Sequence, residues 1–316
     1  PAKSVAGHEV WAARIFLAAQ VGLIVLILRL GLDWPLTILT VGMMTLMYLV
    51  VSRISAETGL FFINPRWQPW GVFLGLLGAY ALGPEALVIV GTLCAVLSIG
   101  AGQVLMPYLV NGLKTGTDLG LRPSRAAWAT AGTYVLCLAL ALFVVLWANY
   151  SFGVGTTGYS ADRVPKMVFR VAINEVDRLA SAAQLDASEQ LGPLERFAEM
   201  RPDPAFLWAA GAGFALVLAF SAMRLRHAWW PLHPVLFLVW MTYPLGRFHF
   251  SFLLGWAIKR TVMRFGGQRT YLNVKPLMIG AVAGDLAASA VFMIAGAVWY
   301  GATGTDPPRF RVFPSG

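Results

Sequence analysis

The sequence predicts an all-α protein, built as a polytopic bundle of transmembrane helices. The chain has 316 residues, of which 58% are hydrophobic and 12% are charged, whereas about a quarter of the residues in a soluble domain are charged. Its mean hydropathy is +0.67, and many of its apolar runs approach or exceed the length of about 20 residues that a membrane helix needs. These observations exclude an ordinary soluble protein and predict about seven or eight membrane segments.

Residues 1–150 are expected to hold the N-terminal transmembrane helices. A short polar link between the first two apolar runs predicts a tight helical hairpin. Residues 52–71 carry charges, an Asn and two prolines within apolar sequence, so we expect either a surface loop or a broken element that lines a cavity. The run that follows is too short to span a membrane unless it begins near Pro69. The apolar runs of this half cover residues 12–32, 35–51, 71–82, 86–110 and 126–150.

Residues 151–204 form the one sizeable extramembrane segment that the sequence predicts. They contain six basic and eight acidic residues, a balance of 6 − 8 = −2. Apolar residues recur every three or four positions between Val164 and Ala183, which predicts an amphipathic helix lying on the membrane or on neighbouring helices. Pro165 suits the first turn of such a helix.

The C-terminal transmembrane helices are expected within residues 205–300, and an extended polar tail at 301–316. Apolar runs cover residues 205–223, 229–258 and 276–300. Pro244 and Gly246 favour a break in the middle run.

The links on either side of this run, residues 224–228 and 259–275, are both basic. Residues 259–275 hold five Lys or Arg and no acid. If both links are cytoplasmic, as the positive-inside rule favours, the middle run is a re-entrant element that turns at residues 242–246. The alternative is one long, kinked and tilted span.

Ionisable side chains at membrane depth cost at least about 2.5 kcal/mol each, so they usually face a cavity, a partner or the bundle interior. Arg53 and Glu57 are spaced to pair on one helical face, just before Thr58. They would either line a substrate or proton pathway or form an interfacial ion pair. Thr58, Gln103 and Asn111 could bind a polar solute, although such side chains also join helices to one another.

The second half of the chain adds four more candidates for a substrate or proton pathway. His233, Arg247 and His249 fall in the Pro-interrupted run, and Asp285 lies near the middle of the last apolar run. Titratable groups of this kind suit proton coupling if they line a cavity. For each histidine the alternative is a satisfied buried or interfacial imidazole.

Signatures of catalysis and of cofactor binding are missing from the sequence. It has no zinc, nucleophile-elbow, Walker or dinucleotide motif, so we expect no enzyme, no cofactor and no metal site. The net charge of 24 − 15 = +9 is spread between apolar runs, which fits membrane orientation rather than nucleic-acid binding. Cys94 and Cys137 lie within apolar runs and are expected to be small core residues.

Three stretches resemble an uncharacterised bacterial membrane family that is similar to the oligopeptide transporters. They read SRISAETGLFFINPRWQPWG (52–71), RLRHAWWPLHPVLFLVW (224–240) and FSFLLGWAIKRTVMRFGGQRTYLNVKPLMIGAVAGD (250–285). Members of that family are typically about twice this long, and the chain resembles their C-terminal half. The resemblance implies a substrate site near the bilayer midplane, at broken helices between two structural halves.

Two functions follow from these observations. The first is a carrier that moves a small polar solute or a peptide by alternating access with proton coupling, in the inner membrane of a bacterial cell. The second is a non-catalytic scaffold or accessory subunit of a larger membrane complex. The expected partners are membrane lipid together with the missing N-terminal half or another membrane subunit, in a homo-oligomer or a larger complex.

Overall fold

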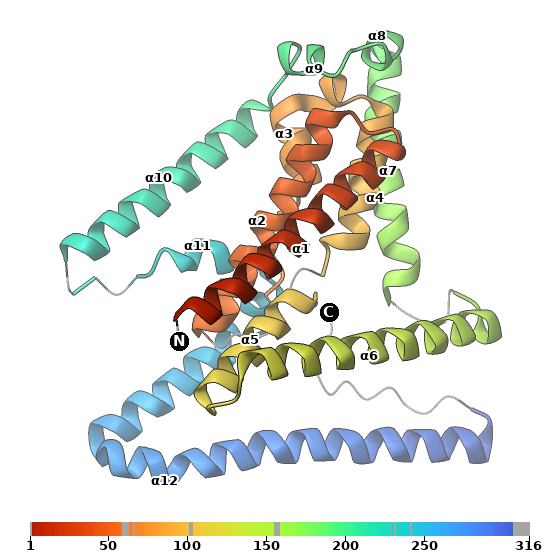
Figure 1. Ribbon diagram of the computed structural model, residues 1–316. Helices are drawn as coiled ribbons and strands as arrows, with labels where there is room; N and C mark the ends of the chain where they lie inside the picture. The colour runs from red at the N-terminus through yellow and green to blue at the C-terminus, as the bar shows by residue number, and fades with distance from the viewer. Residues whose placement is uncertain are drawn as a thin grey trace. The chain divides into compact units, whose positions relative to one another are not determined.

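The computed structural model (Figure 1) describes residues 2–58, 63–65, 67–100, 104–154, 159–227, 229–230, 232–240 and 242–305. Across these ranges the protein is helical and contains no strand. The chain separates into two compact units, Pro1–Tyr243 and Pro244–Gly316. Each unit is described by itself.

Five helices are long and apolar enough to cross a membrane. They are α1 (Ala2–Arg29), α2 (Trp34–Thr58), α6 (Pro123–Phe152), α10 (Pro204–Arg226) and α12 (Tyr243–Thr303). Two shorter apolar helices are α3 (Pro69–Leu82) and α4 (Pro84–Leu97), and the remaining ones are α5 (Leu105–Asp118), α7 (Tyr159–Ser181), α8 (Leu185–Glu189), α9 (Glu195–Ala198) and α11 (Val235–Val239). These helices indicate an integral membrane protein, while the predicted count of seven or eight membrane segments is not confirmed.

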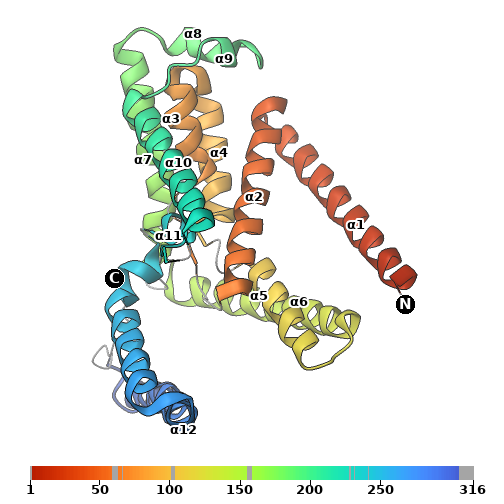
Figure 2. The same ribbon diagram turned by 90° about the vertical axis from the view of Figure 1, so that its left-hand side faces the viewer.

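The predicted hairpin at the start of the chain is confirmed. Helices α1 and α2 diverge from a turn at residues 30–33, as Figure 2 shows. Near this turn they pack against α3 and α4 in the main hydrophobic core, which contains Ile27, Leu36, Trp70, Leu82 and Val90. Helix α3 begins at Pro69, but with 14 residues it is not one of the helices long enough to cross a membrane.

The sequence prediction of one span over residues 86–110 is wrong. Helix α4 ends at Leu97, and α5 begins at Leu105. The Ser98 hydroxyl donates to the Cys94 carbonyl over 2.8 Å, and Pro107 cannot donate the backbone hydrogen bond that a continuous helix requires. Residues 101–103, including Gln103, lie outside the described part of the chain.

The predicted amphipathic helix is α7, and it lies against neighbouring helices. Its buried side, with Val168, Ala172 and Leu179, faces mainly α4. The helix begins at Tyr159, so Pro165 lies in its second turn and the prediction of a first-turn position is wrong. Residues 155–158 of the predicted extramembrane segment lie outside the described ranges.

A polar cap, formed by residues 182–203, covers the end of α3 that adjoins the α3–α4 turn (Figure 1). The backbone amides of Arg201 and Asp203 donate to the carbonyls of Leu77 and Gly75, each over 2.9 Å. These carbonyls are free because Gly78 breaks the helix, with φ 77° and ψ 162°. The irregular backbone of α3 is therefore satisfied by the cap.

The apolar run at residues 229–258 does not form one span. It contains α11, which ends at Val239, and the start of α12 at Tyr243, and the described residues between them, Trp240 and Thr242, are not helical. Pro244 and Gly246, where the re-entrant alternative placed the turn, lie in the first turn of α12 instead. A proline in a first helical turn removes no hydrogen bond, which explains why α12 can begin there. The residues around 242 also mark the boundary between the two units.

Unit 2 consists largely of α12, which is bent at Gly267. Gly267 has φ 69° and ψ −175°, a conformation that glycine adopts without steric cost. The basic residues 259–275, predicted as a link between membrane segments, are therefore mostly helical. Of the predicted tail, residues 301–303 belong to α12 and residues 306–316 lie outside the described chain.

The two cysteines differ in burial. Cys94 is fully buried in the main core, as predicted. Cys137 is exposed on α6, so the prediction that it is a core residue is wrong for this chain. The reason is that the apolar surface of α6 is not packed inside the unit.

Candidate functional site: a polar stripe on α2

Three polar side chains share one face of α2 where this helix passes the α4–α5 break. Tyr48, Ser52 and Ser55 are separated by four and three residues, a spacing that places them on one helical face. The Tyr48 hydroxyl donates to the carbonyl of Leu97, the last residue of α4. Ser52 and Ser55 are each only 2% exposed. We call these three residues the polar stripe.

Helix α5 supplies the partner of Ser55. The Asn111 amide donates to the Ser55 hydroxyl oxygen over 2.7 Å and to the Pro107 carbonyl over 3.0 Å. In addition, the Lys114 ammonium donates to the Ala56 carbonyl near the end of α2. Asn111 therefore joins α5 to α2. Of the two roles predicted for it, a contact with solute or a hydrogen bond between helices, the structure shows the second.

The Ser52 hydroxyl is buried and has no hydrogen-bond partner among the described residues. Most buried hydroxyls in this protein are paired; that of Thr40, for example, donates to the Leu36 carbonyl over 2.7 Å. An unpaired buried hydroxyl costs about 1–3 kcal/mol. Ser52 lies between two members of the stripe that are hydrogen-bonded. A bound polar group would therefore gain the most binding free energy by a hydrogen bond to Ser52.

The chemistry of the stripe is uncharged. The stripe offers hydroxyl groups, and its partners add the Asn111 amide and the Leu97 carbonyl; such groups can bind a neutral polar group by hydrogen bonds. Among the described residues, no group of three or more His, Cys, Asp or Glu could hold a metal ion. The stripe therefore provides recognition chemistry rather than an acid, a base or a nucleophile.

The predicted ion pair of Arg53 and Glu57 forms on α2. It lies on a different face of the helix from the polar stripe. The Arg53 Nε atom lies 2.9 Å from the Glu57 Oε1 atom, and the two side chains are 78% and 60% exposed. The Thr58 hydroxyl donates to the Ile54 carbonyl over 2.6 Å. Residues 59–62 and 66 of the predicted broken segment lie outside the described chain.

The predicted histidines have local hydrogen bonds. His233, exposed in unit 1, accepts a hydrogen bond at Nδ1 from the backbone amide of Val235 over 3.0 Å, at the start of α11. In unit 2, His249 Nδ1 lies 3.1 Å from the Leu245 carbonyl one turn earlier. The side chain of Arg247 lies outside the described part of the structure.

Asp285 is exposed on the second arm of α12. Its backbone carbonyl accepts a hydrogen bond from the Ser289 hydroxyl over 2.7 Å. No ion pair or hydrogen bond joins its side chain to His249 within the described residues. The structure thus brings Arg53 and Glu57 together in unit 1, whereas no such contact joins the described side chains of His249 and Asp285 in unit 2.

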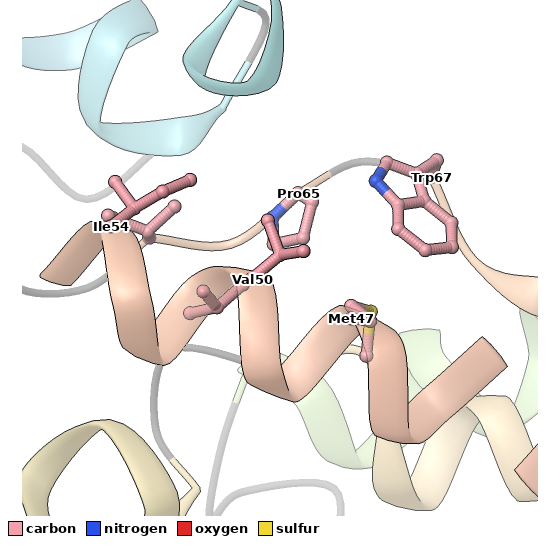
Figure 3. Close-up of a pocket in the computed structure, with 7 residues that line it drawn as sticks. Met47, Val50, Ile54, Pro65 and Trp67 are labelled. Atoms are coloured by element: carbon pink, nitrogen blue, oxygen red, sulfur yellow. The ribbon is translucent and has the colours of Figure 1, made fainter. Parts of the chain in front are cut away.

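The neighbouring face of α2 borders an apolar pocket (Figure 3). In the figure, Met47, Val50 and Ile54 follow one another along α2, and Pro65 and Trp67 lie on the segment opposite. The pocket is a shallow recess with a cavity volume of only about 10 Å³, and it is completed by Val51 and Ile63. Because none of these side chains is charged or carries a hydroxyl or amide, the pocket suits an apolar group.

Sequence reasoning missed the polar stripe because it searched for ionisable residues. The signal was nevertheless present, since Tyr48, Ser52 and Ser55 are polar positions with helical spacing in a mainly apolar run. The sequence could not show that α4 ends at Leu97, next to Tyr48.

The fold and the stripe define an all-helical integral membrane protein with a buried, uncharged polar face. The chain matches a family described as a family of unknown function (DUF6785) over residues 2–305, and it belongs to this family. No curated protein and no solved structure matches the chain.

Proposed function

We propose that this chain is part of a membrane carrier for a small polar solute, and that the polar stripe of α2 contacts the solute. The observation that carries the proposal is the unpaired Ser52 hydroxyl beside the α4–α5 break. Non-helical backbone at membrane depth is tolerated where it is buried in protein or lines a water-filled cavity. Carriers use such breaks as binding sites.

The stripe favours a neutral polar solute, or the neutral part of a larger one such as a peptide, because no charged side chain belongs to it. Bacterial inner-membrane location and proton coupling complete the proposal. Two of the candidates for a substrate or proton pathway, Glu57 and Asp285, are exposed in their own units. The other candidates are Arg53, Thr58, His233, Arg247 and His249. The resemblance of residues 52–71, 224–240 and 250–285 to the oligopeptide-transporter-like family supports this function.

Cysteine accessibility tests the proposal without knowledge of the solute. The full-length protein would carry Ser52→Cys and Cys137→Ala, and native Cys94 would serve as the control in the dry core. In native membranes, a small charged methanethiosulfonate reagent is expected to modify the introduced thiol and to leave Cys94 unmodified. Mass spectrometry of the peptides gives the readout.

A second variant, Glu57→Cys, shows that the reagent reaches the protein, because Glu57 is 60% exposed. If this thiol reacts while Ser52→Cys remains as unreactive as Cys94, the stripe is dry and the carrier proposal fails at this site.

One observation favours the second function, a scaffold or accessory subunit. In the most apolar windows of α6 and α10, none of the residues is buried. Such helices must be covered by lipid or by other protein segments. Gentle extraction into nanodiscs, followed by mass determination, separates the two functions. A monomer or homodimer supports the carrier, and stoichiometric recovery in a larger assembly supports the subunit.

A further inference from the structure

The bend of α12 concentrates positive charge in unit 2. We call its five cationic residues the basic corner: Lys259, Arg260, Arg264, Arg269 and Lys275. All five are exposed, and no acidic residue lies within residues 259–275. None of the five forms an ion pair with a described residue. Within the described residues, no ion pair therefore balances their mutual repulsion.

The bend at Gly267 gathers these cations. Lys259 Nζ lies 5.5 Å from the centre of the Tyr271 ring. In a straight helix, the Cα atoms of these residues would be about 18 Å apart, too far for this contact. The two arms of α12 thus approach each other at the corner, as the bend in Figure 1 shows.

Aromatic rings accompany the cations. The Arg260 guanidinium lies 5.2 Å from the centre of the Trp256 ring, and Arg264 lies 5.9 Å from that of Phe265. Trp and Tyr concentrate at the interface between membrane and water. A cation held over a ring is fixed in position while its hydrogen-bond donors stay free.

The flanking sequence places the corner at the level of the lipid headgroups. Both arms that leave it are mainly apolar, at residues 244–258 and 276–300, and α12 contains an apolar window long enough to cross a membrane. Arms that enter a bilayer hold the residues between them at its surface. Arg and Lys donate strong hydrogen bonds to phosphate oxygens.

From these observations we infer that the basic corner is a binding site for the headgroups of anionic phospholipids. The corner supplies the positive charge, the aromatic residues anchor it at the interface, and the two apolar arms insert beside the acyl chains. Each Lys or Arg near an anionic surface strengthens binding about fivefold, and salt weakens the attraction.

The test compares two double variants of the full-length protein, purified in a neutral detergent. Arg260→Gln with Arg264→Gln removes two charges from the corner. Arg170→Gln with Arg178→Gln removes two exposed charges from α7 and serves as the matched control. Native mass spectrometry gives the Kd of the first bound phosphatidylglycerol and phosphatidylcholine molecules.

We expect the wild-type protein to prefer phosphatidylglycerol. The corner variant should bind it about 25-fold more weakly, and the control variant should bind it as the wild type does. Phosphatidylcholine binding should change in neither. The substituted side chains are exposed, so folding is not expected to suffer.

Three results would overturn the inference: no lipid preference in the wild-type protein, an equal loss in both variants, or no loss in the corner variant. The first would direct attention to an acidic protein partner. Binding of inorganic phosphate alone to the wild-type protein distinguishes a site for free anions from a site for lipid headgroups. Strong binding of phosphate without lipid would also contradict the inference.

Discussion

Arg196 connects three parts of unit 1. From the polar cap, its Nε atom lies 2.5 Å from Asp33 Oδ2 in the α1–α2 turn, and Nη1 donates to the carbonyls of Ala81 and Leu82 over 3.1 and 2.6 Å. The side chain is only 11% exposed. It therefore neutralises a carboxylate and satisfies the carbonyls that the end of α3 leaves unpaired.

We predict that Arg196→Ala lowers the free energy of unfolding by about 2–3 kcal/mol, because a partly buried carboxylate and two carbonyls lose their partner. Arg178→Ala is the control, since Arg178 is 68% exposed in its pair with Glu175 and should cost less than about 1 kcal/mol. Thermal unfolding in detergent compares them. Equal losses of stability in the two variants would show that the Arg196 contacts stabilise the protein no more than the exposed Arg178–Glu175 pair does.

The two serines of the polar stripe should respond to alanine in opposite directions. Ser52→Ala removes an unpaired buried hydroxyl, so stability should stay the same or rise by up to about 1 kcal/mol. Ser55→Ala removes the hydrogen bond to Asn111 and should cost about 1 kcal/mol. Denaturant unfolding of the ligand-free protein measures both. A clear loss for Ser52→Ala would mean that its hydroxyl is already satisfied.

At the scale of the element, the break of α3 depends on Gly78. Its positive φ favours glycine, and a Cβ atom added there would lie 2.6 Å from the Arg201 carbonyl oxygen. The same helix contains Gly71, where an added Cβ meets nothing within 4 Å. Two glycines of one helix thus have different roles, one in a break beneath the cap and one in an open first turn.

We predict that Gly78→Ala destabilises the protein by about 2 kcal/mol or more, through backbone strain and the clash with the cap. Gly71→Ala should be neutral or stabilising by up to about 1 kcal/mol, because alanine favours a helix. Unfolding midpoints give the comparison. Similar effects of the two changes would indicate that the break is not required for the packing of the cap.

At the scale of the whole molecule, α6 exposes apolar side chains on several sides. Leu136, Leu142 and Trp147 are 71%, 56% and 57% exposed. The helix contacts α5, and nothing else in the described chain buries its membrane window. Lipid covers this surface in an independent carrier, whereas a neighbouring subunit covers part of it in an assembly.

A nitroxide label on Cys137 of α6, in a Cys94→Ala background, should report which of these applies. For the proposed carrier we expect frequent collision with dissolved oxygen in native membranes, as at a lipid-facing site. A label on Leu142→Cys with Cys137→Ala samples another side of the same helix. Low oxygen accessibility at either position would show protein contact and favour the subunit.

The sequence predicted the helices whose signal is local. The hairpin of α1 and α2, the start of α3 at Pro69, and the amphipathic α7 follow from apolar periods and from proline positions. The Arg53–Glu57 pair also follows from spacing alone, because both residues lie on one helix. By contrast, the missed break between α4 and α5 lies in a nearly continuous apolar run, where hydropathy cannot distinguish one helix from two.

What the sequence by itself determined is therefore the class of protein: a helical membrane protein with long apolar segments and a cluster of cations at residues 259–275. Only the tertiary structure decided which polar groups are satisfied. Ser52 and Ser55 are chemically identical, and only the position of α5 pairs one and leaves the other free. Burial and hydrogen bonding depend on neighbours from distant parts of the chain, whereas hydropathy and helical spacing are properties of each segment alone.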